Sequence, residues 1–250
     1  MEIRTLKHPH RLDLALASNG TKSIQIIGFD HYRPNTQYFR LILPAFKGKR
    51  TLSIPMGITP LRMELRTNGK LLGLKLGPNP VRLSKQQQAL HRLPSGRSLK
   101  DYLDFVTHFA EQSNYLKAGV HTSKKGDFAI LYDDKVRTVL TGQELFTPMR
   151  VNNITGDVEA SKDYFRHPEI GVFVIIYQFL HELGHYDLGT ADEFEADRYG
   201  ADLFTSLGYP AFSIINFMDS MIYRYEKQYQ TTNQELYERR TALIRHLKNS

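Results

Sequence analysis

The stretch that most constrains the fold is an apolar run that leads directly into a polar motif. Residues 171–180 are almost wholly apolar, and residues 181–185 read His-Glu-Leu-Gly-His. In a helix, residues four apart lie on one face, so both imidazoles can bind a single metal ion. The apolar run requires the helix to be buried, and two buried histidines with a glutamate would cost free energy unless a metal ion or another partner satisfied them. The stretch therefore predicts a buried helix that carries a metal site.

The residues on either side of the motif predict the ends of this helix. Pro168 suits its first turn, where the missing N–H costs nothing, and Gly189 is a good C-terminal stop. We therefore expect a helix over 169–188. If the next helix begins near Thr190, the two helices form a tight hairpin. Gly184 within the motif predicts close approach of another chain segment, since glycine costs a helix about 1 kcal/mol relative to alanine.

Reflection of positions about residue 189 indicates which side chains meet across this hairpin. His185 then lies opposite Glu193, and His181 lies opposite Asp197. Glu193 and Asp197 are themselves four apart and share a face. We therefore predict Glu193 as the third metal ligand. Asp197 is predicted to accept the other ring N–H of a ligating histidine, most directly His181, which would fix the tautomer and orientation of that ring.

A second interpretation of the residues after the motif is open. Residues 190–193, Thr-Ala-Asp-Glu, match a capping box, in which Glu193 would reach back to a backbone N–H. The metal ligand would then be Glu195 or Asp192. In the first interpretation Glu195 points away from the metal, because it lies two residues beyond Glu193 and so on another face of the helix.

Glu182 is predicted to act in catalysis and not as a ligand. It follows His181 directly and so lies about 100° further round the helix, which brings its carboxylate beside a metal-bound water. A carboxylate in that place can act as a general base. The chain contains no cysteine, so a metal must be held by histidine, carboxylate and water.

These residues resemble the gluzincin metallopeptidases. The Glu-x-x-Ala-Asp-Arg-x-Gly pattern at 193–200 is similar to the HtpX-like and Oma-type branch, and His-Glu-Leu-Gly-His-Tyr at 181–186 is also similar to ImmA/IrrE-type peptidases. The motif match covers about 181–204, and a looser similarity extends over about 98–250. The resemblance implies that zinc is bound by the two histidines and Glu193, that Glu182 is the catalytic base and that Asp197 supports a histidine.

The implied function is that of a zinc-dependent endopeptidase, which hydrolyses a polypeptide substrate by Glu-assisted attack of a zinc-bound water. The chain departs from the HtpX-like branch in a short gap between the second histidine and Glu193, and in the absence of that branch's transmembrane helices. The His-Pro segment downstream is also missing. Arg239 or Arg240 is the candidate counterpart of the arginine of that branch.

The rest of residues 98–250 is predicted to complete a zincin-like α+β domain with a helical C-terminal subdomain. We expect a helix from a Ser98 cap to about residue 115, since Asp101 is an acidic residue of the first turn. Hairpins are expected at 128–140 around 133–135, and at 149–160 around Thr155-Gly156. Helices follow from Pro210 and over 232–247. An edge strand before the motif helix would pair with an extended substrate. The polar candidates to face that cleft are Tyr209, Tyr223, Arg239, Arg240 and His246.

Residues 1–90 predict a separate, basic, all-β module, a small antiparallel sandwich or barrel. Apolar and polar residues alternate over 61–67, and Asn68-Gly69 then predicts a hairpin with 70–76. Residues 1–97 hold 17 lysines and arginines against four acids, a net charge of +13. Residues 98–250 hold 16 against 22, a net charge of −6. The opposite signs indicate two modules with different roles.

The basic module predicts an anionic partner, either nucleic acid or an acidic protein. Aromatic and basic residues interleave at 29–33 and 38–40, a pattern typical of surfaces that stack bases and bind phosphates. The other interpretation is that the rings are core residues and the cations cover strands. A structural or assembly protein, of a phage particle or another large complex, is the alternative function. Without a signal peptide or a membrane-spanning run, we expect a cytoplasmic or virion-associated protein.

Overall fold

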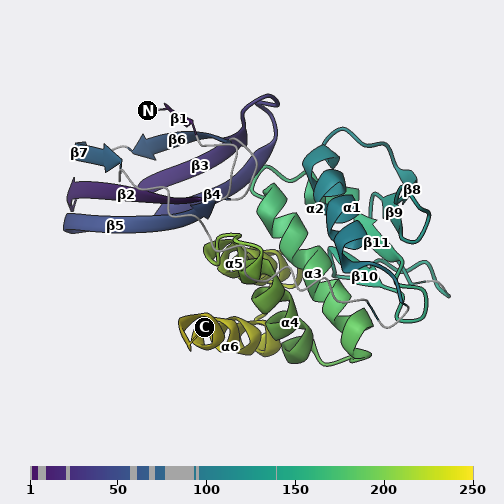
Figure 1. Cartoon of the computed structure of the whole chain (residues 1–250). Helices are drawn as coiled ribbons and strands as arrows, with labels where there is room; N and C mark the ends of the chain where they lie inside the picture. The colour runs from purple at the N-terminus through teal and green to yellow at the C-terminus, as the bar shows by residue number, and fades with distance from the viewer. Residues whose placement is uncertain are drawn as a thin grey trace.

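The computed structural model describes residues 2–4, 10–20, 23–56, 61–67, 71–76, 93, 96–138 and 140–249. The fold is α+β, as predicted (Figure 1). The first part of the chain forms strands β1 (Glu2–Arg4), β2 (His10–Asn19), β3 (Ile24–Asp30), β4 (Gln37–Leu43), β5 (Lys47–Met56), β6 (Leu61–Thr67) and β7 (Leu71–Leu76). The second part forms α1 (Leu99–Gln112), β8 (Gly119–Thr122), β9 (Ala129–Asp133), β10 (Met149–Val151), β11 (Val158–Ser161), α2 (Lys162–Phe165), α3 (Val172–Leu188), α4 (Glu193–Ser206), α5 (Phe212–Tyr229) and α6 (Gln234–Asn249).

The first part is built from two antiparallel sheets, with strand orders β1-β6-β3-β4 and β5-β2-β7. Leu14 and Ile54 of the three-stranded sheet and Ile26 of the four-stranded sheet are fully buried in one core. The predicted alternation along β6 is confirmed at Met63 and Leu65, which are buried, while their neighbours are more exposed.

The predicted hairpin between β6 and β7 is wrong. These strands lie in different sheets, because β6 pairs with β1 and β3 whereas β7 pairs with β2. Residues 68–70 lie outside the described residues. The Asn-Gly turn signal is local, but Leu65 pairs across from buried Ile26 of β3, so burial in the sandwich decides the strand order.

The second part contains a four-stranded sheet with the order β10-β11-β9-β8. The predicted pairing of β10 with β11 is confirmed, and Gly156 adopts a φ of 74° in the turn between them. The predicted hairpin at 128–140 is wrong, because β9 pairs with β8 and β11 and residues 136–138 add only an isolated bridge. The carbonyl of Asp134 accepts hydrogen bonds from Ser161 Oγ and the Asp163 amide, which tie this turn to the start of α2.

Helix α1 begins at the predicted cap, where Ser98 Oγ accepts the amide of Asp101. Helix α3 begins at Val172, three residues later than predicted, and Gly171 is its N-cap. Close packing requires glycine at this position, since a Cβ on Gly171 would lie 2.4 Å from the carbonyl oxygen of Tyr38. The predicted stop at Gly189 is confirmed by its left-handed φ of 62°. No helix among the described residues is long and apolar enough to cross a membrane.

Strand β4 packs the sandwich against the amino end of α3 (Figure 1). Tyr38 and Phe39 are buried there against Phe173, with ring centroids 5.3 Å and 6.0 Å away. The Tyr38 hydroxyl also donates to Glu111 of α1 at 2.7 Å. The aromatic residues at 38–39 are therefore core residues, and they do not form the base-stacking surface considered above. Tyr32, in contrast, is 68% exposed.

Candidate metal centre

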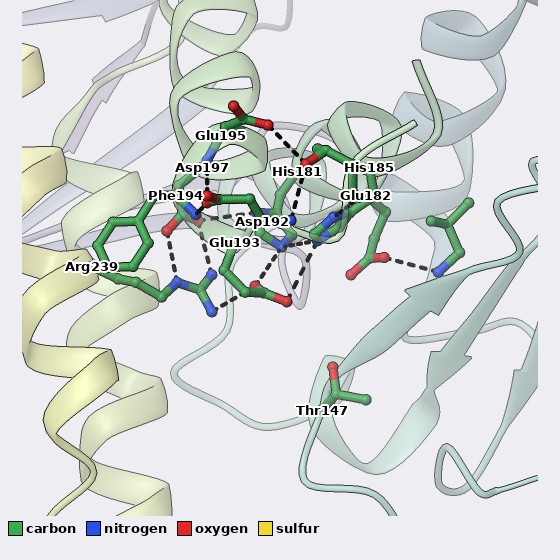
Figure 2. Close-up of polar contacts among 12 residues, drawn as sticks. Thr147, His181, Glu182, His185, Asp192, Glu193, Phe194, Glu195, Asp197 and Arg239 are labelled. Atoms are coloured by element: carbon green, nitrogen blue, oxygen red, sulfur yellow. Dashed lines mark hydrogen bonds and ion pairs between the residues drawn. The ribbon is translucent and has the colours of Figure 1, made fainter. Parts of the chain in front are cut away.

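Helices α3 and α4 form the predicted hairpin, and two glycines allow their close approach. A Cβ on Gly184 would lie 3.1 Å from Cα of Ala196, and a Cβ on Gly200 would lie 2.9 Å from the backbone nitrogen of His181. The prediction of close approach at Gly184 is confirmed. The hairpin brings the histidines of the motif face to face with the carboxylates of α4 (Figure 2).

The side chains of His181, His185 and Glu193 converge on one point. The two Nε2 atoms lie 3.2 Å apart, and those of His181 and His185 lie 3.3 Å and 3.6 Å from oxygens of Glu193. Zinc bonds of about 2.0–2.1 Å at tetrahedral angles would place neighbouring ligand atoms about 3.3 Å apart. The three side chains therefore fit one face of a tetrahedral zinc site.

The tautomers of both histidines follow from what their Nδ1 atoms contact. Nδ1 of His185 lies 2.9 Å from the Thr190 carbonyl, and Nδ1 of His181 lies 3.0 Å from a carboxylate oxygen of Asp197. Both contacts are to acceptors, so each ring, when neutral, would carry its proton on Nδ1 and present the lone pair of Nε2. Two lone pairs and the carboxylate of Glu193 then face one another. Such a set of acceptors favours positive charge between them, either a proton or a metal ion.

The pKa values indicate how strongly positive charge is favoured here. Burial alone would lower the pKa of His181, but hydrogen bonds to Asp197 and Glu193 outweigh it and raise the pKa to about 9. Burial lowers the pKa of His185. A proton on His181 is thus one way to supply positive charge, and a divalent cation that replaces this proton is the other.

Arg239 of α6 supports the carboxylates of α4 from the opposite side (Figure 2). Its Nε and Nη2 donate to the two oxygens of Asp197 at 2.8 Å and 2.9 Å, and Nη1 lies 2.6 Å from Glu193 Oε2. The Tyr177 hydroxyl donates to Asp197 at 3.2 Å. Burial would raise the pKa of Asp197, but hydrogen bonds from His181 and Arg239 hold it well below its usual range. Both carboxylates therefore stay ionised.

Sequence reasoning left the choice between Arg239 and Arg240 open, and the structure places Arg239 at the site. Arg240 pairs with Asp219 on the outside of the helices. Two other candidates also lie elsewhere, since Tyr223 is 59% exposed and His246 pairs with Asp202. Tyr177 was missed. Its position four residues before His181 was the available signal, because residues at that spacing share a helix face.

Glu182 lies beside the three converging side chains and contacts the edge of the small sheet. Its Oε2 accepts the backbone N–H of Val151 in β10 at 2.9 Å. Burial raises the pKa of Glu182 to about 7, partly opposed by the charge of His181. A carboxyl with this pKa can take up and release a proton near neutral pH. Val151 was not predicted, since only the tertiary fold brings β10 to the motif.

The alternative ligands of α4 have other contacts. Helix α4 begins at Glu193 and not near Thr190, because Asp192 is its N-cap and accepts the amides of Phe194 and Glu195. The Glu195 carboxylate accepts the hydroxyl of Thr190 and points away from the histidines (Figure 2). The capping-box interpretation is therefore wrong in its assignment of Glu193, which faces the two histidines.

Comparison of the chain with models of protein families, with curated proteins and with solved structures gives no match.

Proposed function

We propose that the chain is a zinc-dependent peptidase with a zincin-like domain at residues 98–250. The observation that carries this proposal is the set of converging acceptors from His181, His185 and Glu193, with the buried carboxyl of Glu182 beside it. Two nitrogens and one oxygen are a donor set that zinc prefers, and three protein ligands leave a fourth position open, as in catalytic zinc sites. A bound zinc ion would supply Lewis-acid chemistry and would lower the pKa of water.

Each supporting residue has a defined role in this proposal. Asp197 and the carbonyl of Thr190 hold the two rings with their Nε2 lone pairs toward the metal position. The guanidinium of Arg239 contacts Glu193 Oε2, and its positive charge partly balances the negative charges of Glu193 and Asp197. These hydrogen bonds and ion pairs hold the side chains in place, which reduces the reorganisation that binding requires.

Glu182 would take a proton from water and pass it to the leaving amine. The amide of Val151 engages Oε2, which leaves Oε1 as the proton acceptor. The pKa near 7 matches both steps, because a general acid–base group works best when its pKa lies close to the operating pH. The adjacent edge strand β10 would align an extended polypeptide by strand addition.

Substitution of Glu182 by glutamine tests the proposal. We expect hydrolysis of a denatured protein substrate to fall by about 10²–10⁴-fold, because the side chain keeps its size but no longer accepts the proton. Bound zinc, measured by elemental analysis, should stay at the wild-type ratio. The matched control is Glu195→Gln, which alters an acid that points away from the site and should keep both zinc and activity. Wild-type activity in Glu182→Gln, or a purified protein that takes up no zinc, would overturn the proposal.

A further inference from the structure

The outer side of strand β10 faces the site. The carbonyl of Pro148 accepts the amide of Ser161, and the amide of Asn152 donates to Asp157, both at 2.8 Å and both toward β11. Backbone groups alternate in direction along an antiparallel strand, so Val151 directs its N–H to the other side. There it meets Glu182. In the part of the chain that the structure describes, β10 is an edge strand, so a peptide added to it would run past Glu182.

The orientation of such a peptide follows from strand geometry. Antiparallel pairing gives hydrogen bonds perpendicular to the strands and is the more stable arrangement per residue. In that orientation, substrate residues that follow the cleaved bond run from Val151 toward the amino end of β10. The segment that precedes β10 therefore determines how much chain can follow the bond.

Two features of the segment before β10 bear on the length of this path. Thr147 Oγ donates to the carbonyl of Met149 at 2.6 Å and so occupies an acceptor that strand addition would use. Figure 2 shows Thr147 on a loop across from Glu193 and Glu182. Phe146, the residue before it, contacts the rings of Tyr225 and Tyr229 in α5, with centroids 5.1 Å and 5.6 Å away.

Aromatic contacts link the loop before β10 to helix α5. Tyr225 and Tyr229 lie one helical turn apart, and their own ring centroids are 4.7 Å apart. Phe146 contacts both rings, so two separate ring contacts hold the loop against α5. The three rings therefore join the loop before β10 to α5 through more than one contact.

We propose that Phe146, Tyr225 and Tyr229 form a barrier that closes the substrate path on the carboxyl side of the cleaved bond. Val151 and Phe146 are five residues apart, or about 17 Å of extended chain. The rings and Thr147 occupy the far end of this length, so about three substrate residues fit beside the rest of it. The chain then removes short pieces from the carboxyl end of a polypeptide and leaves internal bonds intact. This inference rests on the proposed peptidase function and names the substrate class of the same site.

Mapping of cleavage positions tests the barrier. The zinc-loaded wild-type protein is incubated with a mixture of unfolded synthetic peptides about 20 residues long, roughly 65 Å when extended, and mass spectrometry locates each cleaved bond. We expect cleavage within about three residues of the carboxyl end, at the reach set by the strand spacing. In Phe146→Ala the share of internal cleavage should rise by about 10- to 200-fold, the range that a single apolar pocket contact controls. Tyr223→Ala, an exposed ring on the same helix, is the matched control and should keep the wild-type pattern.

Each result is decisive for one of the two proposals. Internal cleavage by wild type that Glu182→Gln abolishes would overturn the barrier and leave the peptidase function standing. Absence of any cleavage that depends on Glu182 would overturn the peptidase function, and the barrier with it. If Phe146→Ala does not fold, Tyr229→Ala removes a ring of the barrier that is 45% exposed, and zinc content equal to that of wild type shows that its site is intact. An unchanged cleavage pattern in that variant would overturn the barrier.

Discussion

The helices that carry the candidate metal centre and the N-terminal sandwich use charged residues in opposite ways. In the helices, Asp197 of α4 and Arg239 of α6 are buried and form an ion pair with each other. In the sandwich, Lys47, Lys49 and Arg50 of β5 are exposed. A buried charge must be matched by a partner, whereas an exposed charge is solvated whether or not it has one. The comparison indicates that substitution of Asp197 or Arg239 costs more stability than substitution of an exposed lysine or arginine of β5.

The largest expected effect comes from Arg239→Met. This variant leaves Asp197 without the guanidinium that contacts both of its oxygens, and removal of one partner of a buried pair costs about 3–5 kcal/mol. The neighbouring Arg240→Met removes a pair at the surface and should cost about 1 kcal/mol or less. Urea unfolding of both variants in the presence of a chelator measures the difference. Equal losses would remove the contrast between buried and exposed charge.

Zinc should stabilise the two regions unequally. At a free zinc concentration of 100 times the dissociation constant, we expect about 2.7 kcal/mol of added stability. Hydrogen exchange should slow in α3 and α4, which carry the converging side chains, and stay nearly constant in β3 and β4. The same measurement on His185→Ala, which removes one of the three proposed zinc ligands, should show no protection by zinc. Uniform protection across both regions would indicate that zinc acts elsewhere.

The close contact of α3 with α4 predicts a smaller effect for Gly200→Ala. Alanine favours a helix by about 1 kcal/mol over glycine, so propensity alone predicts stabilisation. The new Cβ would lie 2.9 Å from the backbone nitrogen of His181, however, and overpacking of this kind costs about 1–3 kcal/mol. We expect a net loss of stability in thermal or urea unfolding. Arg198→Ala, on the exposed side of α4, is the control and should change stability by at most about 0.5 kcal/mol.

The smallest effects are expected for the basic edge strand β5. Lys47→Ala and Lys49→Ala should each change the free energy of unfolding by about 0.5 kcal/mol or less. Arg50 lies 4.8 Å above the ring of Phe46, so its loss should cost about 0.5–1 kcal/mol. Titration of a DNA probe at two salt concentrations with the same variants tests the predicted nucleic-acid partner. Binding that is equal in wild type and all variants would argue against β5 as the contact surface.

What the sequence could predict differs between the same two regions. Around the motif, each inference depended on helical spacing or on a single tight turn, so Glu193 and Asp197 were predicted from their positions, with Glu195 or Asp192 as the open alternative to Glu193. In the sandwich, the Asn-Gly signal predicted a hairpin that does not form, because β6 pairs with β1 and β3, which lie earlier in the chain. The hairpin predicted around 133–135 also does not form, since the carbonyl of Asp134 is hydrogen-bonded to the start of α2.

The sequence by itself determined the helix hairpin, the shared face of His181 and His185 and the carboxylates opposite them. Helical periodicity is a local property, and a short turn between two helices leaves little freedom in how they meet. Only the tertiary structure decided that Arg239, 42 residues after Asp197, binds that carboxylate, and that Val151 of β10 contacts Glu182. Contacts between distant segments depend on closing long loops and on packing of the whole core, which no local pattern encodes.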